Sequence, residues 1–200
     1  MRIGIDIDDT ITNSWDVLFK EYAKIFNVPE SELINANPYY HNIIKTKYSL
    51  EEYFEKVIPV NDIIVPNLPL KENVKEVIDK LYDLGHTVTF ITARGKENTN
   101  AYEVTKNYLD KHKIKYEKII LGIRSKAEAC INEKIDLLID DSIKHCTAVS
   151  ESGIDVLMFE TRYNKDYNQF KHVKNWNEIY EYIKSRWYIC KIIEFLVVNY

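Results

Sequence analysis

Five short runs of apolar, largely β-branched residues recur along this chain, and this recurrence most restricts its fold. The runs are nearly all apolar rather than alternating, which is typical of strands buried on both faces of a parallel sheet. Between them the apolar residues repeat with a helical period, so the pattern predicts a doubly wound α/β sheet with helices on both faces. We expect strands at residues 2–7, 87–91, 118–121, 136–139 and 155–159, and helices at about 71–84, 97–112, 125–133, 142–151 and 176–186.

The segment between the first strand and Lys71 interrupts this alternation. It contains no strand pattern and is too long for an ordinary loop. Residues 13–26 and 49–57 have helical patterns, and prolines such as Pro59 interrupt the rest of the segment. We therefore expect a core formed by residues 1–12 and 71–200. A helical cap, residues 13–70, would be inserted after the first strand.

Charge and cysteine content exclude several classes of protein. The chain has 27 basic and 31 acidic side chains, a net charge of -4, which argues against binding a nucleic-acid polymer through its phosphates. No basic run indicates a membrane surface. Three widely separated cysteines without a Cys-x-x-Cys motif suit the reducing cytoplasm.

The C-terminal segment 187–198 is apolar, but Lys191 and Glu194 interrupt it. It is also shorter than the roughly 20 residues that span a bilayer as a helix. We expect a final helix that packs on the core or on a second subunit, in which case the protein would be a homodimer.

Acidic, hydroxyl and basic side chains follow the expected strands. Because ligands bind outside the carboxyl ends of the strands in an open parallel sheet, we expect these side chains to converge. Carboxylates without zinc-type ligands suit Mg²⁺, which would offset the repulsion among them. The residues concerned are Asp6 and Asp8 after the first strand, Thr92 and Arg94 after the second, Lys126 after the third, and Asp140 and Asp141 after the fourth.

This mixture of side chains is suited to phosphate chemistry. A metal-held aspartate can attack phosphorus and form an aspartyl-phosphate. A second carboxylate can protonate the leaving oxygen and then deprotonate the hydrolytic water. A lysine and a hydroxyl can hold the phosphoryl oxygens during transfer.

The order and spacing of these residues resemble the four motifs of the haloacid dehalogenase (HAD) superfamily, over about residues 1–160. The motifs are Asp6-x-Asp8-x-Thr10, Thr92 after an apolar strand, Lys126, and Asp140-Asp141. The IDIDDTI opening, the ITARG segment, the helical insert and the ending VKNWNEIYEYI are similar to the 5'(3')-deoxyribonucleotidase group, which includes bacterial nucleotidases.

The resemblance implies a role for each motif residue. Asp6 would be the nucleophile and a Mg²⁺ ligand, and Asp8 the general acid and base, with its backbone carbonyl also on the metal. Thr92 and Lys126 would bind the phosphoryl group. Asp140 and Asp141 would complete the metal site, one of them directly and the other directly or through water. The hydroxyl of Thr10 would fix the turn after the nucleophile.

Other assignments stay open at this point. Arg94 can contact the substrate phosphate or pair with Glu97 at the start of the next helix. Tyr39 and Tyr40 are candidates for stacking on a nucleobase. Taken alone, Asp140-Asp141-Ser142 is also typical of a helix N-cap, and only the combination of the four strand ends favours a catalytic site.

The sequence thus predicts a Rossmann-like, HAD-like fold and a Mg²⁺-dependent phosphatase that cleaves a phosphate monoester through an aspartyl-phosphate. The expected substrate is a nucleoside monophosphate, and the resemblance implies a deoxyribonucleotide. The alternatives are a phosphatase of sugar phosphates or other small metabolites, a non-catalytic regulatory domain that binds a phosphorylated ligand, and a phosphotransferase.

Overall fold

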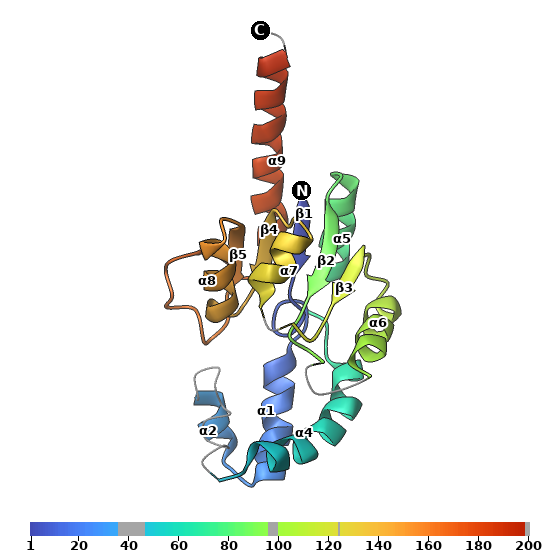
Figure 1. The fold of residues 1–200 in the computed structure, drawn as a ribbon, viewed down its shortest axis with the longest axis vertical. Helices are drawn as coiled ribbons and strands as arrows, with labels where there is room; N and C mark the ends of the chain where they lie inside the picture. The colour runs from blue at the N-terminus through green and yellow to red at the C-terminus, as the bar shows by residue number, and fades with distance from the viewer. Residues whose placement is uncertain (36–46, 96–99, 124, 199–200) are drawn as a thin grey trace.

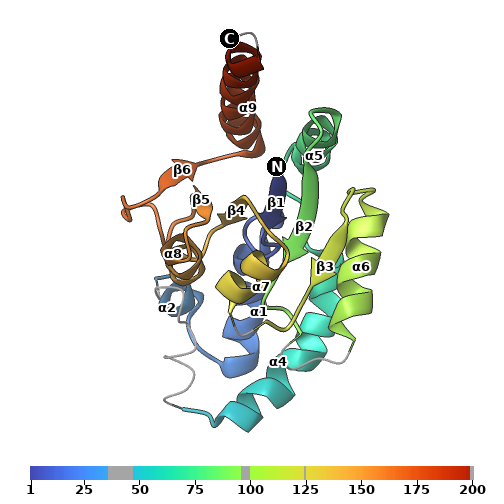
Figure 2. The same ribbon diagram turned by 45° about the horizontal axis from the view of Figure 1, so that its top comes forward.

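The computed structural model describes residues 1–35, 47–95, 100–123 and 125–198. They form a six-stranded sheet in the order β3-β2-β1-β4-β5-β6, in which all neighbouring strands are parallel. Figure 2 shows the strands side by side in this order. The strands are β1 (Arg2–Ile5), β2 (Thr87–Ile91), β3 (Lys118–Ile120), β4 (Leu137–Asp140), β5 (Asp155–Phe159) and β6 (Lys171–Val173). The first five match the expected strands within two residues, and β6 was not predicted.

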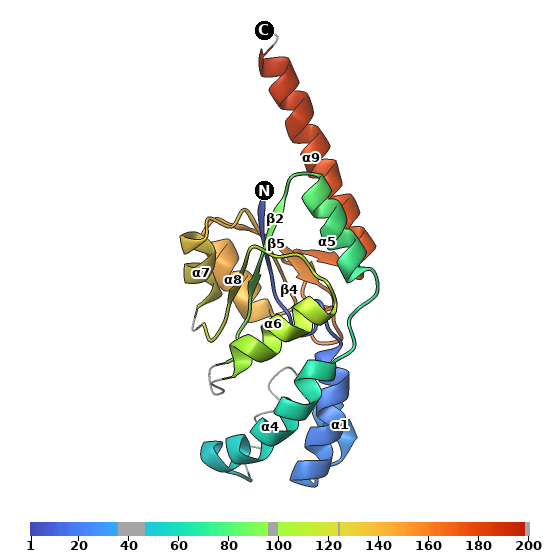
Figure 3. The same ribbon diagram turned by 90° about the vertical axis from the view of Figure 1, so that its right-hand side faces the viewer.

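Helices cover both faces of the sheet, as the sequence predicted. In Figure 3, α5 and α9 lie on one face and α7 and α8 on the opposite face. Helix α6 connects β2 to β3. The bounds are α5 (Val74–Asp83), α6 (Ala101–Lys111), α7 (Lys126–Asn132), α8 (Ile143–Glu151) and α9 (Trp176–Val198). The predicted α/β fold is therefore confirmed.

Strand β1 lies at the point where the order of the strands reverses. It pairs with β2 on one side and with β4 on the other, so that Ile5 is level with both Phe90 and Ile139. The amide of Asp6 donates to the carbonyl of Ile139 over 2.9 Å and extends this pairing by one residue. Asp6 therefore stands at the carboxyl edge of the sheet, at the topological switch point where such sheets bind ligands.

Glycine at position 4 allows close packing in the centre of the sheet. A Cβ atom there would lie 3.2 Å from a methyl group of Ile135 and 3.2 Å from one of Ile91. Both neighbours are buried. The sequence thus keeps its smallest residue where the adjoining apolar layers approach the strand most closely.

Helices α1, α2 and α4 follow β1 and lie beyond the sheet, at the end of the molecule opposite α9 (Figure 1). Their side chains form an apolar cluster of their own, in which the rings of Phe26 and Tyr53 stack with centroids 5.6 Å apart. The bounds are α1 (Ser14–Phe26), α2 (Glu30–Asn35), α4 (Leu50–Ile64) and the 3₁₀ turn η1 (Val65–Asn67).

Helix α4 is longer than the sequence predicted. Ser49 and Glu52 form a capping box at its start, which satisfies backbone N–H groups that the first turn leaves unpaired. We expected a helix at 49–57 with Pro59 beyond its end, but α4 continues to Ile64 and Pro59 lies inside it. A proline inside a helix removes one backbone hydrogen bond. The expectation was wrong because the packing of α4 against the apolar cluster of the insert can outweigh this loss.

The backbone enters and leaves this helical segment at one place. Thr12 and Leu70 form an antiparallel bridge, the amide of Asn13 donates to Pro69, and the amide of Lys71 donates to Ile11. The two crossings are thus hydrogen-bonded to each other. We propose this junction as the boundary between the core and a cap of residues 13–70.

The final helix α9 continues beyond the predicted 176–186 segment, to Val198. Its first half packs on the core through the buried side chains of Trp176, Ile179 and Ile183. None of the described helices has the length and apolar character needed to cross a membrane. A homodimer formed by the apolar end of α9 stays a prediction.

Candidate functional site

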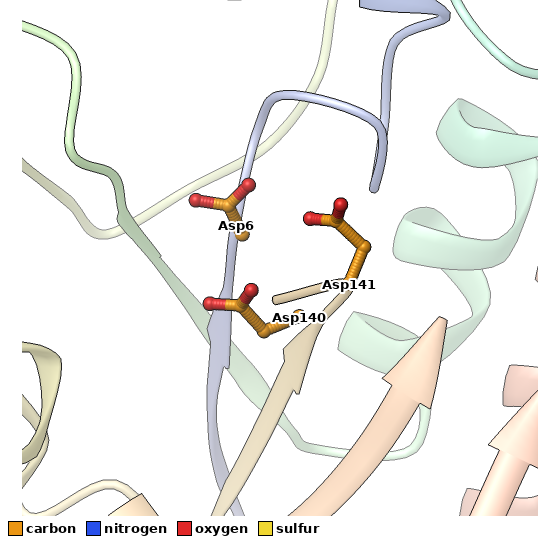
Figure 4. Close-up of side chains that lie close together, drawn as sticks. All are labelled: Asp6, Asp140 and Asp141. Atoms are coloured by element: carbon orange, nitrogen blue, oxygen red, sulfur yellow. The ribbon is translucent and has the colours of Figure 1, made fainter. Parts of the chain in front are cut away.

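Three carboxylates meet at the carboxyl edge of the sheet (Figure 4). Asp6 follows β1, Asp140 is the last residue of β4, and Asp141 comes next. One carboxylate oxygen from each of the three lies within 4.8 Å of the others. Because β1 and β4 are neighbours, two distant parts of the chain are brought to one point.

Lys126 lies among these carboxylates. It is the first residue of α7, its side chain is only 1% exposed, and its Nζ pairs with Asp6 Oδ1 and, over 2.5 Å, with Asp140 Oδ2. Burial alone would lower the pKa of this lysine, but the two carboxylates outweigh burial and raise it. Lys126 therefore keeps its charge although it is enclosed.

One ammonium group does not balance three carboxylates. Burial raises the pKa of Asp6 to about 6 although Lys126 opposes the shift. For Asp140, Lys126 outweighs burial and lowers the pKa to about 2. Burial and the neighbouring Asp140 and Asp6 hold the pKa of Asp141 well above its usual value. This surplus of hard oxygen donors and negative charge fits a divalent cation such as Mg²⁺.

Asp8, two residues after Asp6, accepts three hydrogen bonds from two side chains. Arg94 donates to it through Nε over 2.7 Å and through Nη2 over 2.5 Å, and Ser14 Oγ donates over 2.6 Å. Burial would raise the pKa of Asp8, but the Arg94 guanidinium more than offsets it and lowers that pKa. The described structure therefore pairs Arg94 with Asp8, which neither expectation for this arginine included; Glu97 lies outside the described residues.

Thr92 follows β2 at the same edge of the sheet and is fully buried. Its amide donates to the carbonyl of Ile120 over 3.0 Å, and its hydroxyl accepts from the amide of Arg94 over 3.3 Å. These bonds fix the position of Thr92. Its role in binding phosphate stays a prediction, as do the roles of the other motif residues.

The turn after the nucleophile candidate is fixed differently from the expectation. The hydroxyl of Thr10 is buried and has no hydrogen-bond partner among the described residues. Instead, the Thr12 hydroxyl donates to the Ile7 carbonyl over 3.2 Å. Asp9 adopts the left-handed conformation, with φ 56°, and accepts from the amide of Trp15. Burial raises the pKa of Asp9 to about 7.

Three supporting residues were missed by the sequence analysis. Asn164, after β5, donates to the carbonyl of Asp141 over 2.7 Å. The indole of Trp176 donates to the carbonyl of Thr10 over 3.1 Å, and His145 Nδ1 lies 3.6 Å from Asp140. The rule that polar residues follow strand ends could have identified Asn164. Trp176 lies in the VKNWNEIYEYI segment, to which the sequence analysis gave no role at the site, and no local signal identified His145.

Two cavities adjoin this site. One of about 220 Å³ lies between α4 and α6 and includes Arg94 in its wall. The other, of about 170 Å³, lies beside α1 and includes Asp9. Tyr39 and Tyr40, the expected substrate contacts, lie outside the described residues.

Comparisons with known proteins agree with this geometry. A family model described as "5' nucleotidase, deoxy (Pyrimidine), cytosolic type C protein" matches residues 1–188. A nucleotidase of Clostridium acetobutylicum is 34% identical over an alignment of 186 residues, and the match covers 90% of this chain and 92% of the relative.

Solved structures share the fold at low sequence identity. One described as "a predicted phosphatase" from Clostridium acetobutylicum has a TM-score of 0.70 at 13% identity, over 92% of this chain and 98% of its own. A haloacid dehalogenase-like hydrolase of Streptococcus pneumoniae has a TM-score of 0.66 at 16% identity, over 91% of this chain and 97% of its own. At such identities the likeness establishes the fold alone.

Proposed function

Because this chain belongs to the family of cytosolic type C deoxy-5'-nucleotidases, we propose that it hydrolyses a nucleoside 5'-monophosphate, preferably a deoxyribonucleotide, through an aspartyl-phosphate on Asp6. Family membership identifies it as a HAD-type hydrolase of phosphate monoesters. One observation carries the proposed aspartyl-phosphate mechanism, namely that the carboxylates of Asp6, Asp140 and Asp141 meet within 4.8 Å and that the charged Lys126 pairs with two of them. The preference for a nucleotide rests on the family.

Asp6, Asp140 and Asp141 would hold a Mg²⁺ ion, together with the backbone carbonyl of Asp8. When bound, the ion would offset the charge of the carboxylates and polarise a phosphoryl oxygen. Lys126 is already charged and buried. It would therefore hold a second phosphoryl oxygen without being reoriented, while Thr92 would donate its hydroxyl to a third.

In the first step, a carboxylate oxygen of Asp6 attacks phosphorus, and the bond from phosphorus to the ester oxygen breaks. The electron pair of that bond goes to the leaving oxygen, which takes a proton from the Asp8 carboxyl group. The alcohol, in this case a nucleoside, leaves. The phosphoryl group stays on Asp6 as an acyl phosphate.

In the second step, the Asp8 carboxylate removes a proton from water while the water oxygen attacks phosphorus. The bond between phosphorus and Asp6 breaks, inorganic phosphate leaves, and Asp6 is again a free carboxylate. Arg94 keeps Asp8 ionised in the present arrangement, which suits this step. The first step requires Asp8 to carry a proton, so its pairing with Arg94 must open as substrate binds.

We also propose a cytoplasmic location. Cys130 and Cys146 are buried free thiols, which agrees with a reducing compartment. The family's description as cytosolic supports the same location.

The proposal is tested by phosphate release from nucleoside monophosphates, sugar phosphates and other small phosphate esters, with either MgCl₂ or EDTA added. We expect Mg²⁺-dependent release that is fastest for deoxyribonucleotides. The Asp6→Asn variant should release none, and Asp166→Asn, which alters an exposed carboxylate, should behave as the wild type.

Other outcomes identify the alternatives. Equal or faster hydrolysis of sugar phosphates would favour a phosphatase of small metabolites. Product that appears only with an added alcohol acceptor would indicate a phosphotransferase. Tight binding of a phosphorylated ligand without turnover would indicate a regulatory domain.

A further inference from the structure

The imidazole of His145 has a buried nitrogen without a hydrogen-bond partner among the described residues. This nitrogen, Nδ1, lies 3.6 Å from Oδ2 of Asp140. The side chain as a whole is 27% exposed. Its Nε2 has no described partner either, yet it is not among the buried atoms, so water can reach Nε2 but not Nδ1. Since buried polar atoms in folded proteins are nearly always satisfied, Nδ1 requires an explanation.

The first turn of α8 brings His145 and Asp140 together. Ser142 is the N-cap of this helix, and its hydroxyl accepts from the amide of His145 over 3.4 Å. The amide of Ser142 in turn donates to Oδ1 of Asp140 over 2.8 Å. Ser142 therefore fixes the backbone of the helix start relative to the Asp140 carboxylate, with the imidazole beside the other carboxylate oxygen.

The carboxylate of Asp140 can accept one more hydrogen bond. It is one of the three carboxylates shown in Figure 4 and is fully buried. Its Oδ2 is paired with Lys126 over 2.5 Å. An ionised carboxylate has about four lone pairs in all, so Oδ2 can accept from a second donor. A shift of about 0.4 Å would bring His145 Nδ1 into the range of an N–H···O bond.

A second histidine shows the same arrangement away from this site. Nδ1 of His172 is also buried without a described partner, and it lies 3.6 Å from Oε2 of Glu160. Glu160 follows β5 and is not one of the three carboxylates that meet at the edge of the sheet. His172 therefore offers a matched comparison in which the neighbouring carboxylate is not a candidate metal ligand.

We propose that His145 is a positioning residue, whose Nδ1–H group donates to Oδ2 of Asp140 and holds this carboxylate in place when a divalent ion binds. The assignment rests on the proposed function, in which Asp140 is a ligand of Mg²⁺. Carboxylates that bind metals are themselves held by hydrogen bonds, and loss of such a bond typically weakens metal binding or activity about 10–100-fold. A neutral imidazole with its proton on Nδ1 is sufficient, so this role requires no change in charge.

The test is a calorimetric titration with MgCl₂, without substrate, on three variants of His145. His145→Leu should weaken Mg²⁺ binding about 10–100-fold. His145→Asn should restore most of the affinity, because the amide nitrogen of asparagine takes the place of Nδ1. His145→Gln should not, because its nitrogen is one bond further from the backbone. Since Nδ1 has no partner in the metal-free protein, the Tm of His145→Leu in EDTA should not fall.

His172→Leu is the matched control, and its dissociation constant for Mg²⁺ should equal that of the wild type. Unchanged affinity in His145→Leu, or an equal loss in the control, would overturn the proposal. Failure of asparagine to restore binding, or equal restoration by glutamine, would also overturn it, because the imidazole would then serve only to fill space.

The same titration separates this proposal from the proposed function. If the protein hydrolyses no phosphate ester but the His145 variants bind Mg²⁺ in the expected order, the proposed function fails and the assignment of His145 stands. If nucleotides are hydrolysed but all three variants bind Mg²⁺ as the wild type does, the proposed function stands and the assignment fails. A wild-type protein that binds no Mg²⁺ would overturn the assignment as well.

Discussion

Replacing Asp141 by asparagine should stabilise the metal-free protein and remove its response to Mg²⁺. In the folded state this carboxylate is brought close to Asp6 and Asp140, and burial together with these neighbours raises its pKa well above the usual value. In the unfolded chain Asp6 is far from the other two, and Asp140 and Asp141, although adjacent in the sequence, are surrounded by water, which weakens their repulsion. Asparagine has a similar shape and no charge, so it removes the repulsion with little change in packing.

The magnitude follows from the geometry. Two full charges 4.8 Å apart repel by about 3.5 kcal/mol at an effective dielectric constant of about 20. Asp141 faces two such partners, but attraction to Lys126 and partial protonation of Asp141 offset much of the sum. We expect a net gain of about 1–3 kcal/mol in the free energy of unfolding, which for a chain of this size raises Tm by roughly 3–10 °C.

Thermal unfolding in EDTA and in MgCl₂ measures both effects. Mg²⁺ at ten times its dissociation constant should stabilise the wild type by about 1.4 kcal/mol, and the Asp141→Asn variant should show little of this shift. Asp166→Asn, an exposed substitution, serves as the control. A variant that is less stable than the wild type in EDTA, or that keeps the full Mg²⁺ shift, would show that the three carboxylates do not form a shared ion site.

Three further substitutions test other parts of the structure. Asp9→Asn should stabilise the protein by an amount that grows from about pH 4 to pH 7 and then levels off, at about 1–3 kcal/mol. Burial raises the pKa of Asp9 from 3.8 to about 7, so the folded protein holds this proton more tightly than the unfolded chain, and that favourable contribution is lost as the pH rises through 7. A stability difference that does not vary with pH would contradict this reasoning. Ser49→Ala should cost about 1 kcal/mol in chemical denaturation because it breaks the capping box with Glu52, and an unchanged denaturation midpoint would exclude a role for that cap. Gly4→Ala should cost about 1–3 kcal/mol by overpacking, since the added methyl would lie 3.2 Å from two side chains; an equally stable variant would mean that these neighbours move freely.

The sheet was predictable because buried parallel strands leave a strong local signal. Five strands were found from runs of apolar residues, and fold class followed from their alternation with helices. Strand β6 was missed because Lys171–Val173 is only three residues long and contains lysine and histidine. These residues form a strand because they pair with β5, and no local sequence pattern predicts that pairing.

The candidate site was predictable where it depends on strand ends. Asp6 and Asp140 meet because β1 and β4 are neighbours. In any parallel sheet the residues that follow neighbouring strands lie at the same carboxyl edge. The partner of Arg94 could not be found in the same way, since its bond to Asp8 depends on how the loop after β2 bends. The contact of Trp176 with Thr10 likewise joins two of the quoted segments, IDIDDTI and VKNWNEIYEYI, and nothing in either segment indicates that they touch.

The junction of Thr12 with Leu70 has a consequence for how such proteins can change. The backbone departs from the sheet and returns to it through two hydrogen-bonded segments, so the strands on either side keep their alignment whatever lies between. We therefore expect that recombination at these two points could exchange one stretch of helices for a shorter or longer one while the carboxylates of the candidate site stay in place. Such an exchange at this junction would alter the part of the protein that faces the leaving group, and the residues of the candidate site on the sheet would not have to change.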